Sequence, residues 1–115
     1  MRALVCGGRD YDDREDVWAT LDVLHAEQGL EMILHGGARG ADYWAKTWGE
    51  AMALPVINVD ANWAAYPNGA GPIRNRWMIK YVPVDIVIAF PGGKGTADMI
   101  QVAKDNGIQV YEPKK

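Results

Sequence analysis

The sequence contains no serine and only one cysteine, and these two shortages exclude several kinds of chemistry. Without serine there can be no Ser-His-Asp hydrolase. The single thiol, Cys6, cannot form an internal disulfide, which favours a protein of the reducing cytoplasm. Cys6 has two interpretations. It is either a nucleophile close to a ligand site or, as is more common for a lone cysteine, a small buried hydrophobic side chain.

Histidine and long apolar runs are also scarce. The two histidines, His25 and His35, are isolated in the sequence, so no metal site of known spacing can be assembled and no cofactor is expected. His35 ends a predicted strand, where it is either a ligand contact or a hydrogen-bonded core residue. No apolar run approaches the length that spans a bilayer, and the N-terminus does not resemble a signal peptide. We therefore expect a soluble cytoplasmic protein with no membrane partner.

The chain also lacks an excess of positive charge. The chain has 12 Lys and Arg residues against 15 Asp and Glu, for a net charge of -3. This balance argues against a protein that coats nucleic acid through bulk positive charge. Two nucleotide-binding motifs are also absent, because neither glycine-rich loop is followed by the Lys-Ser/Thr of a P-loop, and no GxGxxG pattern occurs.

The residues that are present predict one domain, residues 1–115, of alternating strands and helices. Apolar runs without polar alternation predict strands at 2–6, 32–35, 55–59, 84–90 and 109–111. Between them, helices are expected after a cap at Asp12 or Asp13, closed by Gly29, and then from Ala41, from Pro72 to Tyr81, and over 97–106. The stripe Ala41, Trp44, Ala45, Trp48 and Met52, together with Trp77, is predicted to be core. Residues 60–71 read as an irregular loop over a site, with Trp63 either stacking on a base or packing at the sheet edge.

This alternation predicts an α/β, Rossmann-like three-layer sandwich with a five-stranded parallel sheet. In the strand order 3-2-1-4-5, the loops that begin at Gly7, Gly36 and Gly92 open side by side at the carboxyl ends of the strands, where such folds bind ligands. A flavodoxin-like order, 2-1-3-4-5, is the alternative, and it would separate the Gly92 loop from the Gly7 loop by a strand. The order 3-2-1-4-5 therefore predicts a single glycine-rich crevice.

Cations are concentrated in these loops although the whole chain is acidic. Glycine-rich backbone combined with arginine is typical of a phosphate site, whereas the alternative is that each cation is an ordinary solvated loop charge. Arg74 and Arg76 are two positions apart on a helix, so at most one is expected to face the crevice. The candidate ligand-binding residues are Gly7, Gly8, Arg9, Gly36, Gly37, Arg39, Gly40, Asp42, Arg74, Arg76, Pro91, Gly92, Gly93, Lys94, Gly95 and Thr96.

Three motifs resemble those of one superfamily. The stretch Gly36-Gly37-Ala38-Arg39-Gly40-Ala41-Asp42 is similar to the Gly-Ala-Arg-Gly-Ile-Asp motif of the DNA-processing proteins Smf and DprA, as is Arg74-Asn75-Arg76 to their Arg-Asn-Arg helix start. The stretch PGGKGT at 91–96 resembles the PGGxGT motif of the "lonely guy" phosphoribohydrolases. Together the motifs resemble the SLOG superfamily, a Rossmann-like fold, and most closely its single-domain YspA/YpsA-related branch of bacteria and phages.

The resemblance implies a nucleotide site whose catalytic residues are incomplete. In the phosphoribohydrolases the glycine loops hold the phosphate of a nucleoside 5'-monophosphate, and an Arg and a Glu act at the ribose. The Arg corresponds to Arg74, but the Glu position is Met99. Asp98 and Asp42 are the carboxylates left to replace that Glu. Both are predicted in first helical turns, where a carboxylate is also favoured by the helix dipole alone.

Three functions follow from different classes. The favoured one is a sensor or carrier that binds a nucleotide or nucleotide-derived phosphate ligand without chemistry. The second is a nucleoside 5'-monophosphate phosphoribohydrolase with Arg74, Asp98 and Asp42 as its catalytic candidates. The third, single-stranded DNA binding like that of DprA, is disfavoured by the acidic charge balance. The partner expected is thus a nucleotide-like small molecule, and a homodimer is left open.

Overall fold

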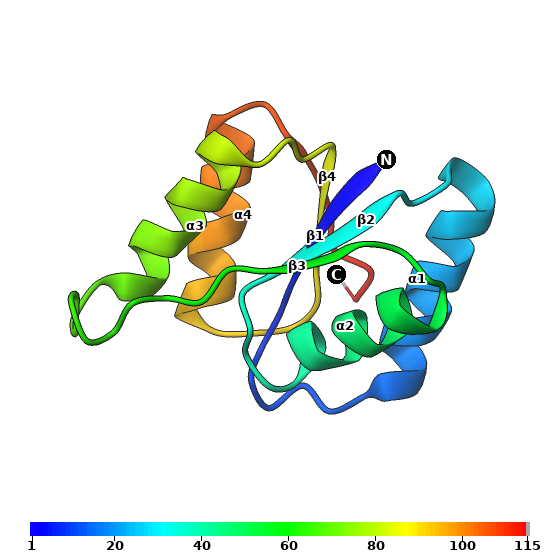
Figure 1. Cartoon of the computed structure of the whole chain (residues 1–115), viewed down its shortest axis with the longest axis horizontal. Helices are drawn as coiled ribbons and strands as arrows, with labels where there is room; N and C mark the ends of the chain where they lie inside the picture. The colour runs from blue at the N-terminus through cyan, green and yellow to red at the C-terminus, as the bar shows by residue number, and fades with distance from the viewer. Residues whose placement is uncertain (115) are drawn as a thin grey trace.

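The computed structural model describes residues 1–114 and places one five-stranded parallel sheet between two layers of helices (Figure 1). The strands are β1 (Arg2–Cys6), β2 (Met32–His35), β3 (Val56–Asn58), β4 (Ile86–Ala89) and β5 (Gln109–Tyr111), and the helices are α1 (Arg14–Gln28), α2 (Ala41–Ala51), α3 (Ala70–Tyr81) and α4 (Lys94–Asp105). The strand order is β3-β2-β1-β4-β5, which confirms the predicted α/β fold and its order 3-2-1-4-5.

Each face of the sheet is covered by one pair of helices. Ala3, Val5 and Ile33 point into a core shared with α1 and α2, whereas Leu4 and Leu34 point into a second core with α3 and α4. Figure 1 shows these pairs on opposite sides of the strands. Because both faces are buried, the strands carry apolar side chains at successive positions, which is why their sequences show no polar alternation. No helix within residues 1–114 is long and apolar enough to cross a bilayer.

The register brings three strand ends to the same edge of the sheet. Cys6, the last residue of β1, is the partner of Ala89, the last residue of β4, and β2 pairs with the other side of β1. The loops that follow β1, β2 and β4 therefore start as immediate neighbours.

The helix boundaries agree with the sequence at some ends and differ at others. Asp13 caps α1 by accepting a hydrogen bond from the Asp16 N–H, and Gly29 ends it with φ +71°, as predicted. Helix α3, however, begins at Ala70 instead of Pro72, and α4 begins at Lys94 instead of Ala97. Each of these helices follows a glycine N-cap with no side-chain cap among the described residues. No capping residue therefore marks the start in the sequence.

The strands β3 and β4 are shorter than the apolar runs 55–59 and 84–90. Just beyond the carboxyl ends of β3 and β4, one residue of each run still donates a backbone hydrogen bond to the neighbouring strand. Val59 N–H donates to the His35 carbonyl and Phe90 N–H to the Cys6 carbonyl, each at 2.9 Å. The apolar runs extend past the ladder, with Phe90 buried, Val59 and Val84 half-buried and Pro55 exposed. The apolar runs therefore predicted the positions of the two strands correctly but overestimated their lengths.

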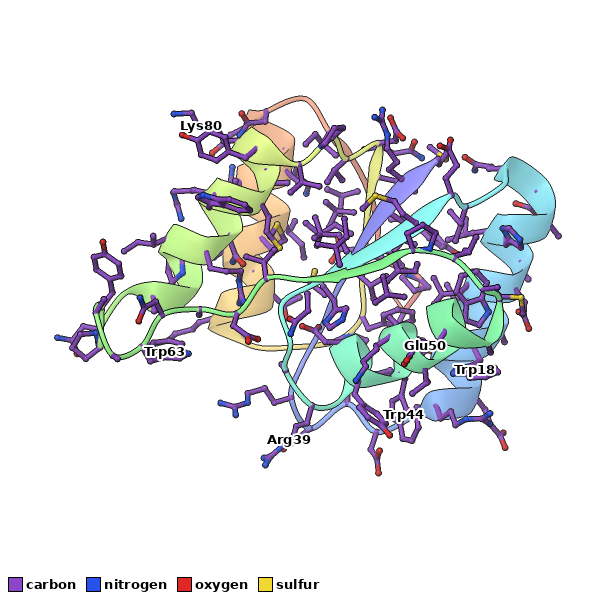
Figure 2. The ribbon with its side chains drawn as sticks, in the orientation of Figure 1. Trp18, Arg39, Trp44, Glu50, Trp63 and Lys80 are labelled. Carbon is purple, nitrogen blue, oxygen red and sulfur yellow. The ribbon has the colours of Figure 1, made fainter. Side chains whose placement is uncertain are left out.

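Two side chains predicted to be core are exposed. Met52 lies at the C-cap of α2 and is 40% exposed, because the helix ends one residue before it. Trp77 is 48% exposed on the outer face of α3, where its ring contacts Tyr81 at 5.3 Å. Trp48 is fully buried, and Trp44 is half-buried. Figure 2 shows the side chains that extend from the two helical layers, including Trp44.

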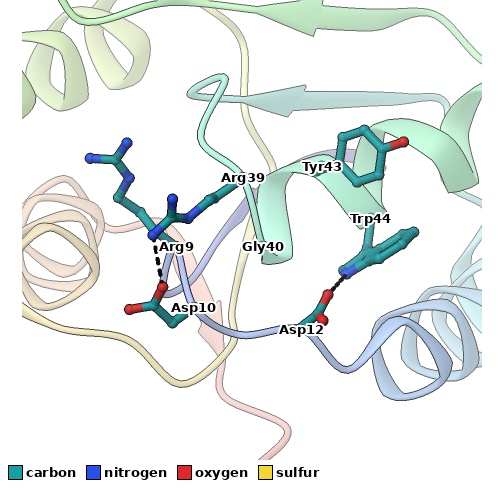
Figure 3. Close-up of a pocket in the computed structure, with 7 residues that line it drawn as sticks. All are labelled: Arg9, Asp10, Asp12, Arg39, Gly40, Tyr43 and Trp44. Carbon is teal, nitrogen blue, oxygen red and sulfur yellow. Dashed lines mark hydrogen bonds and ion pairs between the residues drawn. The ribbon is translucent and has the colours of Figure 1, made fainter.

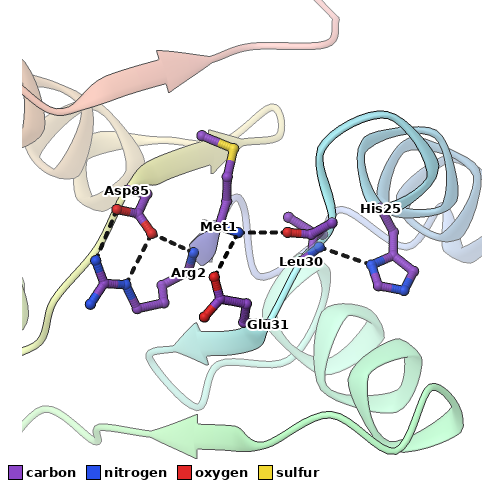
Figure 4. A network of polar contacts seen from close by, with 7 residues as sticks. Met1, Arg2, His25, Leu30, Glu31 and Asp85 are labelled. Atoms are coloured by element: carbon purple, nitrogen blue, oxygen red, sulfur yellow. Dashed lines mark hydrogen bonds and ion pairs between the residues drawn. The ribbon is translucent and has the colours of Figure 1, made fainter.

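A polar network fixes the amino-terminal edge of the sheet (Figure 4). The Arg2 guanidinium donates to both carboxylate oxygens of Asp85 at 3.0 Å, and the Arg2 backbone N–H donates to the same group at 2.7 Å. Beside it, the Met1 ammonium donates to the Gly29 carbonyl at 2.6 Å. This network joins the starts of β1 and β4 at the edge opposite the glycine loops.

Candidate functional site

A crevice of about 840 Å³ opens at the carboxyl ends of β1, β2 and β4, between the loops that follow these strands and helix α3. Its volume lies in the range of small-molecule sites. It brings together many of the predicted ligand residues from three separate loops and from the helices α2, α3 and α4: Gly7, Gly8, Arg9, Gly36, Gly37, Asp42, Arg74, Gly93, Lys94, Gly95 and Thr96. The convergence of the glycine loops, expected from strand order alone, is therefore present.

The loop before α4 presents the start of that helix to the crevice. Gly93 is its N-cap, and no side chain of the described residues caps it, so the first N–H groups of α4 are available to a ligand. Gly93 and Gly95 have open space where a side chain would be, since no atom lies within 4 Å of an added Cβ. This geometry suits an anion that approaches the helix end.

The Gly92 backbone is packed behind this anion position. A Cβ at Gly92 would lie 2.6 Å from the Gly8 nitrogen, and the Gly8 N–H donates to the Pro91 carbonyl at 2.8 Å. Pro91 and Gly92 therefore hold the first and last glycine loops together and do not line the crevice. Glycine is needed here for packing between backbones.

Arg74 lies in the wall of the crevice and is held by backbone carbonyls. Its Nη1 donates to the Gly36 carbonyl at 2.8 Å and to the Val59 carbonyl at 3.2 Å. A Cβ at Gly36 would lie 2.7 Å from the guanidinium carbon, so only glycine allows this approach. None of the hydrogen bonds within residues 1–114 involves Nη2 of Arg74, which leaves that nitrogen for a ligand.

Asp42 lies beside Arg74 and is 6% exposed. One of its carboxylate oxygens accepts hydrogen bonds from Gly36 N–H at 3.0 Å and from Ala38 N–H at 3.3 Å. Burial raises the pKa of this carboxyl from 3.8 to about 6, against the opposing effects of those two N–H groups and of the Arg74 charge. The crevice thus contains one carboxyl group that can exchange a proton near neutral pH.

Comparison with known proteins agrees with this geometry. A family model described as the YspA, cpYpsA-related SLOG family matches residues 1–66, more than half of the chain. The chain belongs to this family. It is also 37% identical over 117 residues to the Gene 61 protein of Mycobacterium phage D29, covering 95% of this chain and 93% of that protein. Membership of the SLOG family suggests a nucleotide-related function for the Rossmann-like fold, and the relative's name states no activity.

In this SLOG domain the two arginines of the Arg74-Asn75-Arg76 motif have different positions. Arg76 lies outside the crevice and pairs with both carboxylate oxygens of Asp98 at 3.2 Å. Asp98 also accepts a hydrogen bond from Asn75 Nδ2 at 3.1 Å. Because α4 begins at Lys94, Asp98 lies beyond the first helical turn, and it does not line the crevice. The structure therefore places Arg74 and Asp42 at the crevice and Asp98 in a bridge between α3 and α4.

Two other side chains with possible chemistry are Cys6, in the lining of the crevice, and His35, which is hydrogen-bonded to the crevice residue Gly37. Burial raises the pKa of the Cys6 thiol far above the usual value, which disfavours the reactive thiolate. His35 is 2% exposed, its Nδ1 accepts from Gly37 N–H at 3.0 Å, and its Nε2 has no partner among the described residues. Burial lowers the pKa of His35, so it is neutral at pH 7. Met99, at the position where the phosphoribohydrolases that the motif resembles have their Glu, lines the crevice and is 1% exposed.

The crevice also contains polar residues that sequence reasoning did not select. Asp60 and Asn68 line it from the loop that connects β3 to α3, and Asn75 lines it from α3. Trp63, the predicted stacking residue, lies in the same loop, is 55% exposed and approaches Gly71 (Figure 2). The loop was predicted to cover a site, but its irregular sequence gave no periodicity from which the inward positions could be read. Within residues 1–114 no cluster of three His, Cys, Asp or Glu side chains could hold a metal ion.

Proposed function

We propose that this protein binds a nucleotide or nucleotide-derived phosphate ligand in the crevice, as a sensor or carrier. The observation that carries the proposal is the uncapped start of α4, which opens into a crevice shared with Arg9, Arg74 and Lys94. A phosphate there accepts from free backbone N–H groups and is balanced by three cations. Trp63 and Asn68, which line the same crevice, supply a stacking surface and a hydrogen-bonding group for a base.

Thermal denaturation with a panel of ribonucleoside 5'-monophosphates tests this proposal. A ligand at a hundred times its Kd adds about 2.7 kcal/mol to the free energy of unfolding, which raises Tm by on the order of 10 °C for a domain of this size. Gly93→Val and Arg74→Ala should remove the rise in Tm, because the first obstructs the helix start and the second removes a crevice cation. The proposal fails if no phosphate-bearing nucleotide raises Tm.

Matched controls separate loss of the ligand site from loss of the fold. Gly69, the N-cap of α3, also has open space around an added Cβ but does not line the crevice. Arg76 belongs to the same helix as Arg74 and lies outside. Gly69→Val and Arg76→Ala should therefore keep the ligand-induced rise in Tm, and an equal loss in all four variants would contradict a specific role for Arg74 and Gly93.

A second candidate is phosphoribohydrolase activity, which the protonatable Asp42 carboxyl in the crevice favours. In that reaction water adds to C1' of the ribose and the N-glycosidic bond breaks. The leaving base takes the proton of the Asp42 carboxyl, and the carboxylate that results takes the proton that the added water loses. Incubation with nucleoside monophosphates would release free base and ribose 5-phosphate. Absence of both products for every base that binds would exclude this activity. Single-stranded DNA binding and a homodimer stay predictions, for which the tests are salt-dependent affinity and light scattering.

A further inference from the structure

Beside the crevice lies a second cavity of about 540 Å³, which we call the side cavity (Figure 3). It is lined by Arg9, Asp10, Asp12, Arg39, Tyr43 and Trp44, next to Gly40 at the start of α2. Arg9 lines both the side cavity and the crevice. The sequence predicted one crevice containing Arg9, Arg39 and Gly40, whereas the structure divides these residues between two openings that share one arginine.

The division results from contact between two glycine loops. Gly40 has φ +81°, and a Cβ on it would lie 2.7 Å from the Arg9 carbonyl oxygen. The backbone of one loop therefore lies directly on the other, and Arg9 lines the opening on each side of this contact. A ligand that reaches from the crevice into the side cavity must pass this arginine.

The two arginines of the side cavity make few interactions with the rest of the described chain. Arg9 makes no hydrogen bond or ion pair with any of residues 1–114. Arg39 Nη2 donates to Asp10 at 3.0 Å, but the two side chains are 72% and 92% exposed, so the pair contributes little stability. Asp12, the other carboxylate, accepts a hydrogen bond from Trp44 Nε1 at 3.2 Å. Figure 3 shows the Asp10 carboxylate at the Arg39 guanidinium and the Asp12 carboxylate turned toward Trp44.

An aromatic wall completes the side cavity. The Tyr43 and Trp44 rings meet edge to face at 4.9 Å, and Tyr43 is 47% exposed. Cations beside an exposed aromatic ring form a combination that binds a phosphate together with a planar base. The volume of the side cavity also lies in the range of small-molecule sites.

We propose that the side cavity is a second subsite for the same ligand, which carries a second phosphate group beyond Arg9. Asp10 occupies the place on Arg39 that this phosphate takes, and the phosphate displaces it because Arg binds phosphate through paired, charge-assisted hydrogen bonds. The ligand class is therefore a nucleotide with two separated phosphates, either a nucleoside bisphosphate or a 5'-phosphorylated dinucleotide. This inference rests on the proposed function of the crevice.

Isothermal titration calorimetry with three sets of probes tests the second subsite: ribonucleoside 5'-monophosphates, the matching 3',5'-bisphosphates and the 5'-phosphorylated dinucleotides. With the wild-type protein, the second phosphate should lower Kd at least about ten-fold. Arg39→Gln should abolish this gain and leave the Kd of the monophosphate unchanged. Asp10→Asn should strengthen binding of the doubly phosphorylated probes alone. Glu27→Gln, which removes one exposed negative charge from α1, is the control and should change neither the Kd of the monophosphates nor that of the doubly phosphorylated probes.

The outcomes separate this inference from the proposed function. A lower Kd for the bisphosphate alone supports a phosphate subsite, and a still lower Kd for the dinucleotide, lost in Tyr43→Ala, adds the stacked base. If the monophosphates bind but the second phosphate brings no gain, or if Arg39→Gln weakens both probe types equally, the second subsite is overturned while the crevice function stands. If none of the probes binds, both proposals fail.

Discussion

The fold disfavours the ionised form of the Asp42 carboxyl, and the free energy of unfolding should therefore depend on pH. Its pKa is about 6 in the folded chain, against 3.8 normally, because the carboxyl is buried. Between these values the folded state holds more protons than the unfolded state, so stability falls as pH rises from about 4 through 6. Asp42→Asn should remove this fall, because an amide oxygen still accepts from Gly36 and Ala38 but does not ionise.

Urea unfolding at pH 4 and pH 8 measures the effect. From pH 4 to pH 8 the free energy of unfolding of Asp42→Asn should rise relative to that of the wild type by roughly 2 to 3 kcal/mol. This value follows from the shift in the pKa at about 1.4 kcal/mol per unit. Asp10→Asn is the control, because Asp10 is 92% exposed and its replacement should change stability by less than about 0.5 kcal/mol. A difference between the Asp42 variant and the wild type that does not vary with pH would refute the assignment.

Gly95 is a residue where ligand binding and stability should oppose each other. It is the second residue of α4, it lines the crevice, and an added Cβ meets no atom within 4 Å. Gly95→Ala should therefore stabilise the unliganded protein by up to about 1 kcal/mol through helix propensity. The same methyl group obstructs close approach of a phosphate, so the variant should melt higher alone and show a smaller nucleotide-induced rise in Tm. A methyl group tolerated without loss of affinity would show that no phosphate lies against this turn.

At the scale of elements, Asn75 is the bridge that holds α3 against the start of α4. It is 3% exposed; its Oδ1 accepts from Arg74 Nε at 3.0 Å, and its Nδ2 donates to the Gly95 carbonyl at 3.3 Å. Asn75→Ala leaves both groups without that partner, which costs about 1 to 3 kcal/mol. Arg76→Gln breaks the ion pair with Asp98, in which the Arg76 side chain is 58% exposed, and a hydrogen bond to the Pro72 carbonyl at 3.0 Å; it should cost at most about 1 kcal/mol. Chemical denaturation of both variants compares them, and equal losses would contradict the bridging role of Asn75.

Element type could be predicted from the sequence more accurately than element boundaries. Apolar runs and helical spacing identified every strand and helix now described in residues 1–114. Asp12 or Asp13 was expected to cap α1, and Asp13 is the residue whose side chain does so. The starts of α3 and α4 were missed because glycine precedes them and gives no capping signal. Trp77 was assigned to the core from its residue type, although its place on the helix, one turn from the exposed Tyr81, leads outward.

At the scale of the whole molecule, the crevice could be predicted because parallel strands in the order 3-2-1-4-5 bring their loops to one edge. Its division into two cavities could not, because it depends on the left-handed backbone of Gly40 and on the contact of that residue with the Arg9 carbonyl. The same limit applies to Asp98. Its position followed from the helix start, and an error of three residues there placed it in the wrong turn.

The edge of the sheet that carries the glycine loops and the amino-terminal edge are separated by the length of the strands, so stability and the proposed binding should be separable. Hydrogen bonds from the Arg2 side chain and from its backbone N–H lower the pKa of Asp85 to about 2. The ionised carboxylate therefore stabilises the fold above about pH 4, the ordinary carboxyl pKa, and this stabilisation is lost as pH falls through about 2. Asp85→Asn should unfold at lower urea concentration than the wild type at pH 7. The difference should shrink as the pH falls toward 2.

Affinity for the best-binding nucleotide of the panel supplies the second measurement. It should be the same for Asp85→Asn and the wild type at a temperature where both are folded, because the Arg2–Asp85 pair joins the starts of β1 and β4 and the ligand loops follow their ends. Arg2→Gln is the matched control and should lose the same pH dependence. A gap between variant and wild type that stays constant from pH 7 to pH 2.5 would refute the role of the pair, and a weaker nucleotide Kd in Asp85→Asn would show that the two edges are coupled.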